Sequence, residues 1–108
     1  MENYWKYIES IADDIMNERE HWDEDCLQDV IHEHCDGSQL VIYYSQAHDF
    51  IKWLGYGMQS YAEDMVADCY GGEYLGYDKQ ASLIAYFALE KMLSEELQER
   101  LSKEEEAA

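Results

Sequence analysis

The sequence predicts an all-α protein, a compact bundle of about five helices in a single domain. Three observations predict this class. Apolar residues recur every three to four positions, proline is absent, and glycine is confined to a few short breaks between helical stretches. Hydrophobic residues make up 47% of the 108 residues, enough for one modest core. We expect this domain to span residues 1–103, with a frayed acidic tail at residues 104–108.

The first two helices are predicted from apolar periodicity and one capping residue. A helix over about residues 3–20 is indicated by four residues at helical spacing: Trp5, Ile8, Ala12 and Ile15. The next helix should begin near Asp23, because a carboxylate suits the N-cap, and it should bury Leu27, Val30 and Ile31.

A third helix is predicted over about residues 39–54. Gly37 suits the end of the preceding helix, and Ser38 suits the N-cap of this one. Asp49 is the only acidic residue in the segment, which predicts that it is the most buried element. Leu40 to Tyr44 alone would also suit a strand, but no second strand is predicted nearby.

The C-terminal half is predicted to hold two more helices. One follows Gly55 and Gly57 and spans about residues 58–69. Residues 70–77 contain three glycines and three tyrosines and are typical of a loop. We expect Asp78 to cap a last helix that runs to about residue 103.

The charge of the chain limits its partners. It has 25 acidic and 7 basic residues, a formal net charge of −18. Such a surface repels nucleic acid phosphates and anionic membranes and attracts basic proteins. We therefore expect a basic protein partner, with no direct binding of nucleic acid and no membrane association.

Cysteine usage and hydropathy indicate a cytoplasmic protein. The three cysteines form no CxxC pair, and an odd number argues against a disulfide framework. No signal peptide is recognisable, and the longest apolar run, Leu40 to Tyr44, is far too short to span a membrane.

The acidic residues fall into rows when they are placed on helical wheels at about 100° per residue. The first predicted helix carries Glu2, Glu9, Asp13 and Glu20, and the second carries Asp25, Asp29, Glu33 and Asp36. The fourth carries Glu63, Asp64 and Asp68, and the last carries Glu95, Glu99 and Glu106. Row neighbours four residues apart are separated by about 6 Å along the axis, on the scale of phosphates along a DNA strand. The alternative is an ordinary solvated face, which does not explain the near-absence of Lys and Arg beside these acids.

One segment of the chain resembles a known family. Leu27-Gln28-Asp29-Val30-Ile31-His32, followed by Tyr43-Tyr44 and a long acidic C-terminal helix, is similar to the Ocr family of anti-restriction proteins of T7-like phages. The resemblance implies a homodimeric DNA mimic that blocks DNA-binding defence enzymes, such as restriction or CRISPR-type complexes, in the host cytoplasm. The acidic rows would then form the mimic surface.

Catalytic and metal-binding arrangements are weakly indicated. His32-Glu33-His34-Cys35, with His48, contains metal-ligand types, but neighbouring positions on a helix diverge. Glu18 and His21 form one ExxH spacing, whereas di-iron bundles use two. We expect no enzyme activity, no catalytic residues, no metal and no cofactor.

Aromatic residues are predicted in two roles. Five are expected in the core because they recur with aliphatic residues: Trp5, Tyr44, Phe50, Tyr61 and Phe87. Tyr70, Tyr74 and Tyr77, in the glycine-containing loop, are candidates for an interface, and packing of the loop itself is an equal alternative.

The leading hypothesis is therefore an inhibitor that occupies the DNA-binding surface of a defence enzyme through rows of carboxylates. One alternative is a small acidic adaptor or assembly protein that binds a basic partner unrelated to DNA. A second is a metal-binding protein based on His21, His32, His34 and His48.

Overall fold

The computed structural model describes residues 3–107, and the side chains of residues 3–104. The described chain is helical and contains no strand, which confirms the predicted all-α class. Its elements are α1 (Tyr4–Asn17), the 3-10 helices η1 (Arg19–His21) and η2 (Glu24–Cys26), α2 (Leu27–Asp36), α3 (Gln39–Ile42), α4 (Tyr44–Trp53), α5 (Tyr56–Tyr70) and α6 (Tyr77–Ala107). None of the helices described is both long and apolar enough to cross a membrane.

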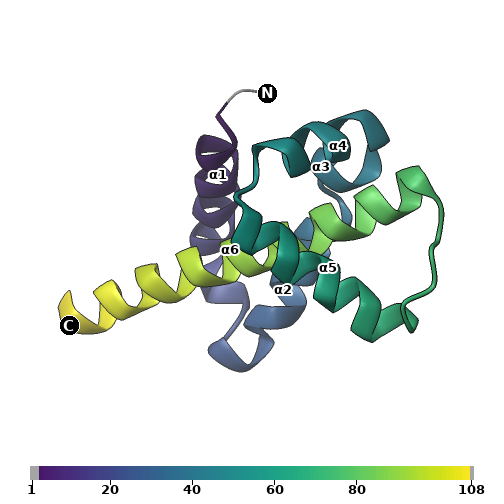
Figure 1. Ribbon diagram of the computed structural model, residues 1–108. Helices are drawn as coiled ribbons and strands as arrows, with labels where there is room; N and C mark the ends of the chain where they lie inside the picture. The colour runs from purple at the N-terminus through teal and green to yellow at the C-terminus, as the bar shows by residue number, and fades with distance from the viewer. Residues whose placement is uncertain (1–2, 108) are drawn as a thin grey trace. The chain divides into compact units, whose positions relative to one another are not determined.

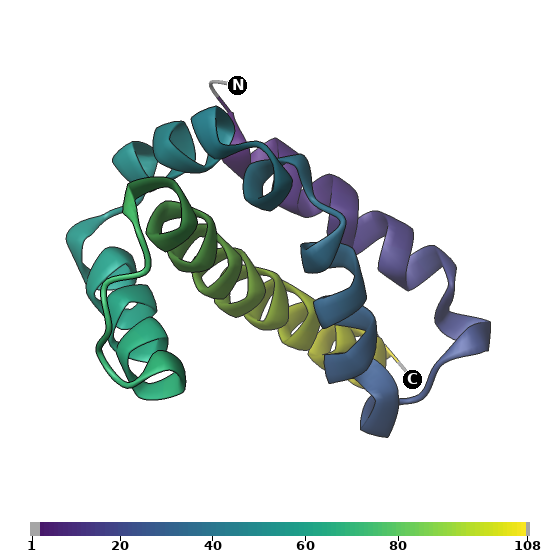
Figure 2. The ribbon, with the colours of Figure 1, turned by 90° about the vertical axis from the view of Figure 1, so that its right-hand side faces the viewer.

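The contacts within the chain divide it into two units. The first unit holds residues up to His34 together with Glu90 and the residues after it, and the second holds Cys35–Leu89. Helix α6 is continuous, and Figures 1 and 2 show its green N-terminal part, which belongs to the second unit, and its yellow C-terminal part, which belongs to the first.

In the first unit, α1 begins at an Asn3 cap, whose side chain accepts a hydrogen bond from the Lys6 amide at 3.1 Å. The helix buries Tyr4, Ile8, Ala12 and Ile15. It ends at Asn17, before the predicted residue 20, because the chain turns to bury Trp22. The Trp22 indole donates a hydrogen bond to the Ile15 carbonyl at 2.8 Å and so satisfies one of the carbonyls left open at the end of the helix.

The rest of the first unit follows the predicted pattern in part: Leu27 and Ile31 are buried as predicted, but Val30 is only half-buried. Asp23 caps η2 by accepting a hydrogen bond from the Cys26 amide at 3.0 Å, and η2 leads directly into α2. Helix α6 contributes a buried stripe at a spacing of four residues: Leu93, Leu97 and Leu101. Helix α6 also continues to Ala107, beyond the predicted end near residue 103. Residues 104–107 are all Glu and Ala, which favour helix.

In the second unit, the predicted helix over residues 39–54 is broken in two at Tyr43. Ser38 caps α3 as predicted, accepting a hydrogen bond from the Leu40 amide at 3.2 Å. Tyr43 then has extended backbone angles, φ −95° and ψ 113°. The β-branched and aromatic run Val41–Tyr44 has little preference for helix, and the Val41 carbonyl accepts a hydrogen bond from the Ser82 hydroxyl at 2.7 Å.

This break contradicts the prediction that residues 39–54 form the most buried element. The side chains of Ile42, Tyr43 and Tyr44 are 46–58% exposed, although Leu40, Ala47 and Phe50 are fully buried. Low acidity therefore does not mark burial here, because the segment presents aromatic rings rather than charges to solvent.

Helix α5 and the first part of α6 complete the second unit. Gly71 ends α5 with φ 71°, a left-handed conformation that a side chain would strain, and the segment 71–76 leads to α6 (Figure 2). Helix α6 begins at Tyr77, so Asp78 lies in its first turn rather than at the predicted N-cap. The Gly76 carbonyl accepts the first hydrogen bond, from the Gln80 amide at 2.8 Å.

Candidate functional site: an acidic surface

The predicted row acids that the structure describes are all exposed. They are Glu9, Asp13, Glu20, Asp25, Asp29, Glu33, Asp36, Glu63, Asp64, Asp68, Glu95 and Glu99. Glu2 lies outside the described residues, and so does the side chain of Glu106. Exposure alone does not distinguish a binding surface from a solvated one. The ion pairs of each row show how much of its negative charge is left to attract a basic partner.

The row on α2 takes part in no ion pair within the part of the chain that the structure describes. Asp29 and Glu33 lie one helical turn apart, and Asp25 precedes them on η2. No ion pair within residues 3–104 involves any of these three acids, which we call the α2 acidic row. Asp36 ends the same helix, is equally exposed and belongs to the second unit. Like charges at this spacing destabilise a helix by about 0.2–0.5 kcal/mol per pair, a cost that the fold does not offset with a lysine or arginine.

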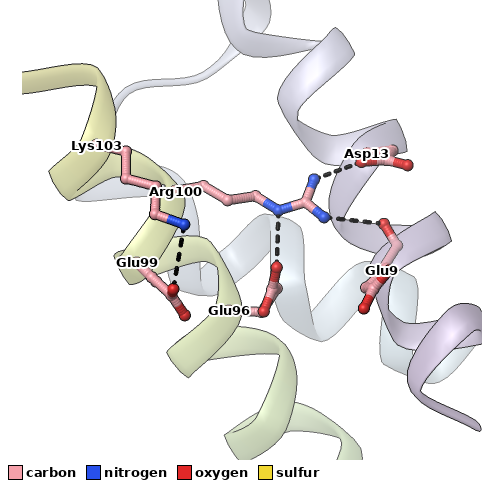
Figure 3. A network of polar contacts seen from close by, with 6 residues as sticks. All are labelled: Glu9, Asp13, Glu96, Glu99, Arg100 and Lys103. Carbon is pink, nitrogen blue, oxygen red and sulfur yellow. Dashed lines mark hydrogen bonds and ion pairs between the residues drawn. The ribbon is translucent and has the colours of Figure 1, made fainter. Parts of the chain in front are cut away.

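Around α1 the carboxylates are drawn into a network with Arg100 of α6 (Figure 3). The Arg100 guanidinium donates hydrogen bonds to the carboxylates of Asp13 and Glu96, the latter at 3.0 Å, and lies 3.5 Å from the Glu9 carbonyl oxygen. Burial lowers the pKa of Arg100, but its hydrogen bonds to the carboxylates of Asp13 and Glu96 outweigh burial, so the pKa is raised and the charge is permanent. The α1 row is therefore partly neutralised.

Glu20 does not continue the α1 row. It lies in η1, after α1 has ended, and the 3-10 geometry of three residues per turn removes the angular relation that the wheel assumed. The prediction that Glu2, Glu9, Asp13 and Glu20 form one row is therefore wrong for Glu20.

The C-terminal row on α6 is paired with lysines from the same helix. Lys91 lies 3.5 Å from Glu95. Lys103 lies 3.3 Å from Glu99, a pair shown in Figure 3. Arg19 also approaches Glu104 at 3.8 Å. The expectation that Lys and Arg are nearly absent from the acidic faces is therefore wrong for α6.

The acids on α5 form a second group without cations. Glu63, Asp64 and Asp68 are exposed, and none takes part in an ion pair within the part of the chain that the structure describes. This group belongs to the second unit and is considered separately from the α2 acidic row.

Two of the four histidines, His32 and His48, each lie beside a separate carboxylate. His32 Nε2 lies 3.1 Å from Glu90 Oε2, an oxygen that is shielded from solvent. His48 Nε2 lies 3.0 Å from Asp78 Oδ1, and its ring stacks on Tyr77. Across residues 3–104, no three His, Cys, Asp or Glu side chains are close enough to hold a metal ion.

The aromatic predictions are confirmed only in part. Phe50 is fully buried, and Tyr61 and Phe87 are half-buried. Trp5 and Tyr44 are 49% and 46% exposed, which contradicts their assignment to the core. In α1 the buried aromatic is Tyr4 instead of its neighbour, because the face that includes Ile8 and Ile15 passes closer to residue 4.

The predicted loop over residues 70–77 is shorter in the structure, because Tyr70 ends α5 and Tyr77 begins α6. Tyr70, Tyr74 and Tyr77 are exposed but do not line one surface. Tyr74 and Tyr77 line a cleft with residues of α4, whereas Tyr70 lines a separate depression with Val41 and Phe87. The stacking of the His48 ring on Tyr77 could not be predicted from the sequence, because the two residues lie far apart along the chain.

One exposed cysteine is affected by the acidic surface. The hydrogen bond with Asp23 and the negative charge of that carboxylate raise the pKa of the Cys26 thiol, and the charge of Asp29 adds to the effect. The Cys26 thiol is therefore less ionised at neutral pH than an ordinary exposed cysteine.

Comparison with known proteins identifies no relative: no family model, no curated protein and no solved structure matches this chain.

Proposed function

We propose that this protein is a DNA-mimic inhibitor, which occupies the DNA-binding surface of a host defence enzyme of the restriction or CRISPR type. The observation that carries the proposal is the α2 acidic row: three exposed carboxylates, of which Asp29 and Glu33 lie about one helical turn apart on α2, with no ion pair within the described residues. The resemblance of residues 27–32 to the Ocr family supports the same function.

The physical argument concerns what the row gains on binding. Unpaired carboxylates at close spacing repel one another, and a basic groove relieves that repulsion as it does for the phosphates of DNA. The net charge of −18 adds a long-range field that speeds association with a basic protein and weakens as salt increases. A solvated face without a binding role would tolerate lysines among its acids, as the C-terminal row of α6 does.

The ion pairs narrow the proposed mimic surface. Glu95 and Glu99 are balanced by lysines and Asp13 by Arg100, so these acids present less net charge to a partner. Asp36 and the group Glu63, Asp64 and Asp68 belong to the second unit and are considered separately. In the first unit, the surface we propose is the α2 acidic row. A homodimer, which the family resemblance implies, would double this surface, and light scattering on the purified protein measures its mass directly.

A displacement experiment tests the function. The purified protein is used to capture partners from a bacterial lysate at low salt, and each captured DNA-binding enzyme is then bound to a fluorescently labelled duplex. A DNA mimic releases the duplex in proportion to the protein added, and the release weakens as salt rises. If the captured partners keep their DNA, the protein is an acidic adaptor rather than a mimic.

A further inference from the structure

An apolar cleft of about 290 Å³ lies in the second unit, lined by residues of α4, of the segment 71–76 and of the first turns of α6. Its apolar lining comes from Ile51, Ala81 and Ile84, of which Ala81 and Ile84 are buried. The volume is at the lower end of the range for ligand pockets, about 300–1,000 Å³. It therefore suits a single large side chain better than an extended ligand.

The rim of the cleft is aromatic and partly fixed in place. Tyr74 and Tyr77 are 72% and 70% exposed. The Tyr77 ring stacks on His48 with centroids 4.2 Å apart, and His48 Nε2 lies 3.0 Å from the carboxylate of Asp78. These contacts already hold the side chains of His48 and Tyr77 in position. Binding of an incoming ring against them would therefore cost little additional side-chain entropy.

The charges in and around the cleft restrict what can enter it. Lys52 is the one Lys or Arg among the lining residues, and no ion pair within the described residues involves it, so a cationic side chain would be repelled from the interior. The exposed Lys79 adjoins the lining residue Gln80 along the chain. Three exposed carboxylates, Asp49, Glu73 and Asp78, adjoin the lining residues His48, Tyr74 and Tyr77, in keeping with the net charge of −18. They would attract basic residues next to the inserted group.

We propose that this cleft receives an aromatic side chain that projects from a basic segment of the protein partner. The inference rests on the proposed function for the basic character of that partner. It assigns to the cleft the selection of one partner among basic proteins. The acidic surface attracts many basic proteins, and the cleft retains those that present a ring between lysines or arginines. Burial of the ring persists at salt concentrations that screen the carboxylates.

Two short peptides test the cleft directly, Lys-Lys-Trp-Lys-Lys and Lys-Lys-Ala-Lys-Lys, each titrated into the protein and followed by NMR. Wild-type protein should bind the tryptophan peptide about tenfold more tightly, from the apolar area of the ring. The shifted resonances should include those of Ile51, Ile84 and Tyr77. The preference should survive at about 0.5 M salt, where both peptides bind more weakly.

Variants of the cleft residues test whether the preference for the tryptophan peptide arises in the cleft. Tyr74→Ala removes one rim ring, and Ala81→Leu fills the floor; both should abolish the preference for tryptophan. Tyr56→Ala is the matched control, because Tyr56 is 87% exposed and does not line the cleft, and it should keep the preference. Circular dichroism verifies that each variant is folded, and Tyr74→Ala, at an exposed position, keeps the test valid if Ala81→Leu does not fold.

The inference is overturned if wild-type protein binds the two peptides equally, or if the preference persists in the Tyr74→Ala variant. Its failure is distinguishable from that of the proposed function, because peptide selection and DNA displacement are separate readouts. If the protein selects the tryptophan peptide but displaces no DNA, the cleft proposal is supported and the DNA-mimic function is contradicted.

Discussion

Two acidic rows in the first unit have the same pattern in sequence and opposite electrostatic surroundings. On η2 and α2, Asp25, Asp29 and Glu33 have no ion pair within the described residues. On the last part of α6, Glu95 and Glu99 each lie within 3.5 Å of a lysine. The α6 row resembles the self-balanced surface of an ordinary helix, and the charges of the α2 row are not compensated by a lysine or arginine within the described residues.

The largest expected difference between the two rows is in partner binding. Replacing Asp25, Asp29 and Glu33 together by Asn, Asn and Gln should weaken binding to a captured DNA-binding enzyme roughly 10- to 100-fold at low salt, because three uncompensated charges are lost. The matched control replaces Glu95 and Glu99 by Gln, which should change affinity much less. Titration of both variants in the DNA-displacement assay measures the effect, and equal losses would remove the distinction between the rows.

The next largest effect is on stability, at the one arginine that links α6 to α1. Arg100 is 24% exposed and bonds to Asp13 and Glu96, so Arg100→Met should lower the free energy of unfolding by about 1–2 kcal/mol. Lys103→Met is the control, because Lys103 is 71% exposed and its pair with Glu99 should contribute less than about 0.5 kcal/mol. Urea denaturation of both variants tests this, and a larger loss for Lys103→Met would contradict it.

A smaller effect should have opposite signs in the two rows. Asp29→Asn removes a like-charge neighbour from the α2 acidic row and should raise the free energy of unfolding by about 0.2–0.5 kcal/mol. Glu99→Gln removes the partner of Lys103 and should lower it by a similar or smaller amount. Thermal melts at low and at high salt give the comparison, since added salt should shrink both differences. Changes of the same sign in both variants would argue against unrelieved repulsion on α2.

The smallest effect concerns cysteine reactivity at the start of the α2 acidic row. The Asp23 carboxylate raises the pKa of the Cys26 thiol, so the thiolate forms only at higher pH. Asp23→Asn keeps a capping side chain and removes the charge, and it should move the alkylation of Cys26 toward lower pH. The rate with iodoacetamide is measured from pH 7 to pH 9 by mass spectrometry in a Cys69→Ser background. An unchanged pH profile would show that the Asp23 carboxylate does not control this thiol.

The helical class and most helix ends followed from local sequence signals. The caps at Asp23 and Ser38 and the end of α5 near Gly71 depend on a few neighbouring residues, which a sequence displays directly. Just before the break at Tyr43, the Val41 carbonyl accepts a hydrogen bond from the hydroxyl of Ser82, which is 41 residues further along the chain than Val41. A contact between segments so far apart in the sequence leaves no mark on the spacing of apolar residues from which the helices are predicted.

The sequence predicts where the acidic residues lie on each helix, but not every contact that neutralises them. The wheel places Asp29 and Glu33 on one face because that relation belongs to one helix. The pairs Lys91–Glu95 and Glu99–Lys103 were also readable, since both have the four-residue spacing that brings side chains together. The contact between Arg100 and Asp13 joins residues 87 apart, and only the folded chain brings them together.

The burial of Trp22 also gives the molecule an internal optical reporter. Its ring is 8% exposed, with Arg19 stacked 4.6 Å above it, whereas the other tryptophan of the first unit, Trp5, is half exposed. Trp53 lies in the second unit, its ring stacked near Phe50. After Trp5→Phe, each unit holds one indole, and the emission spectrum records in a single cuvette whether the two units lose their structure together or in succession.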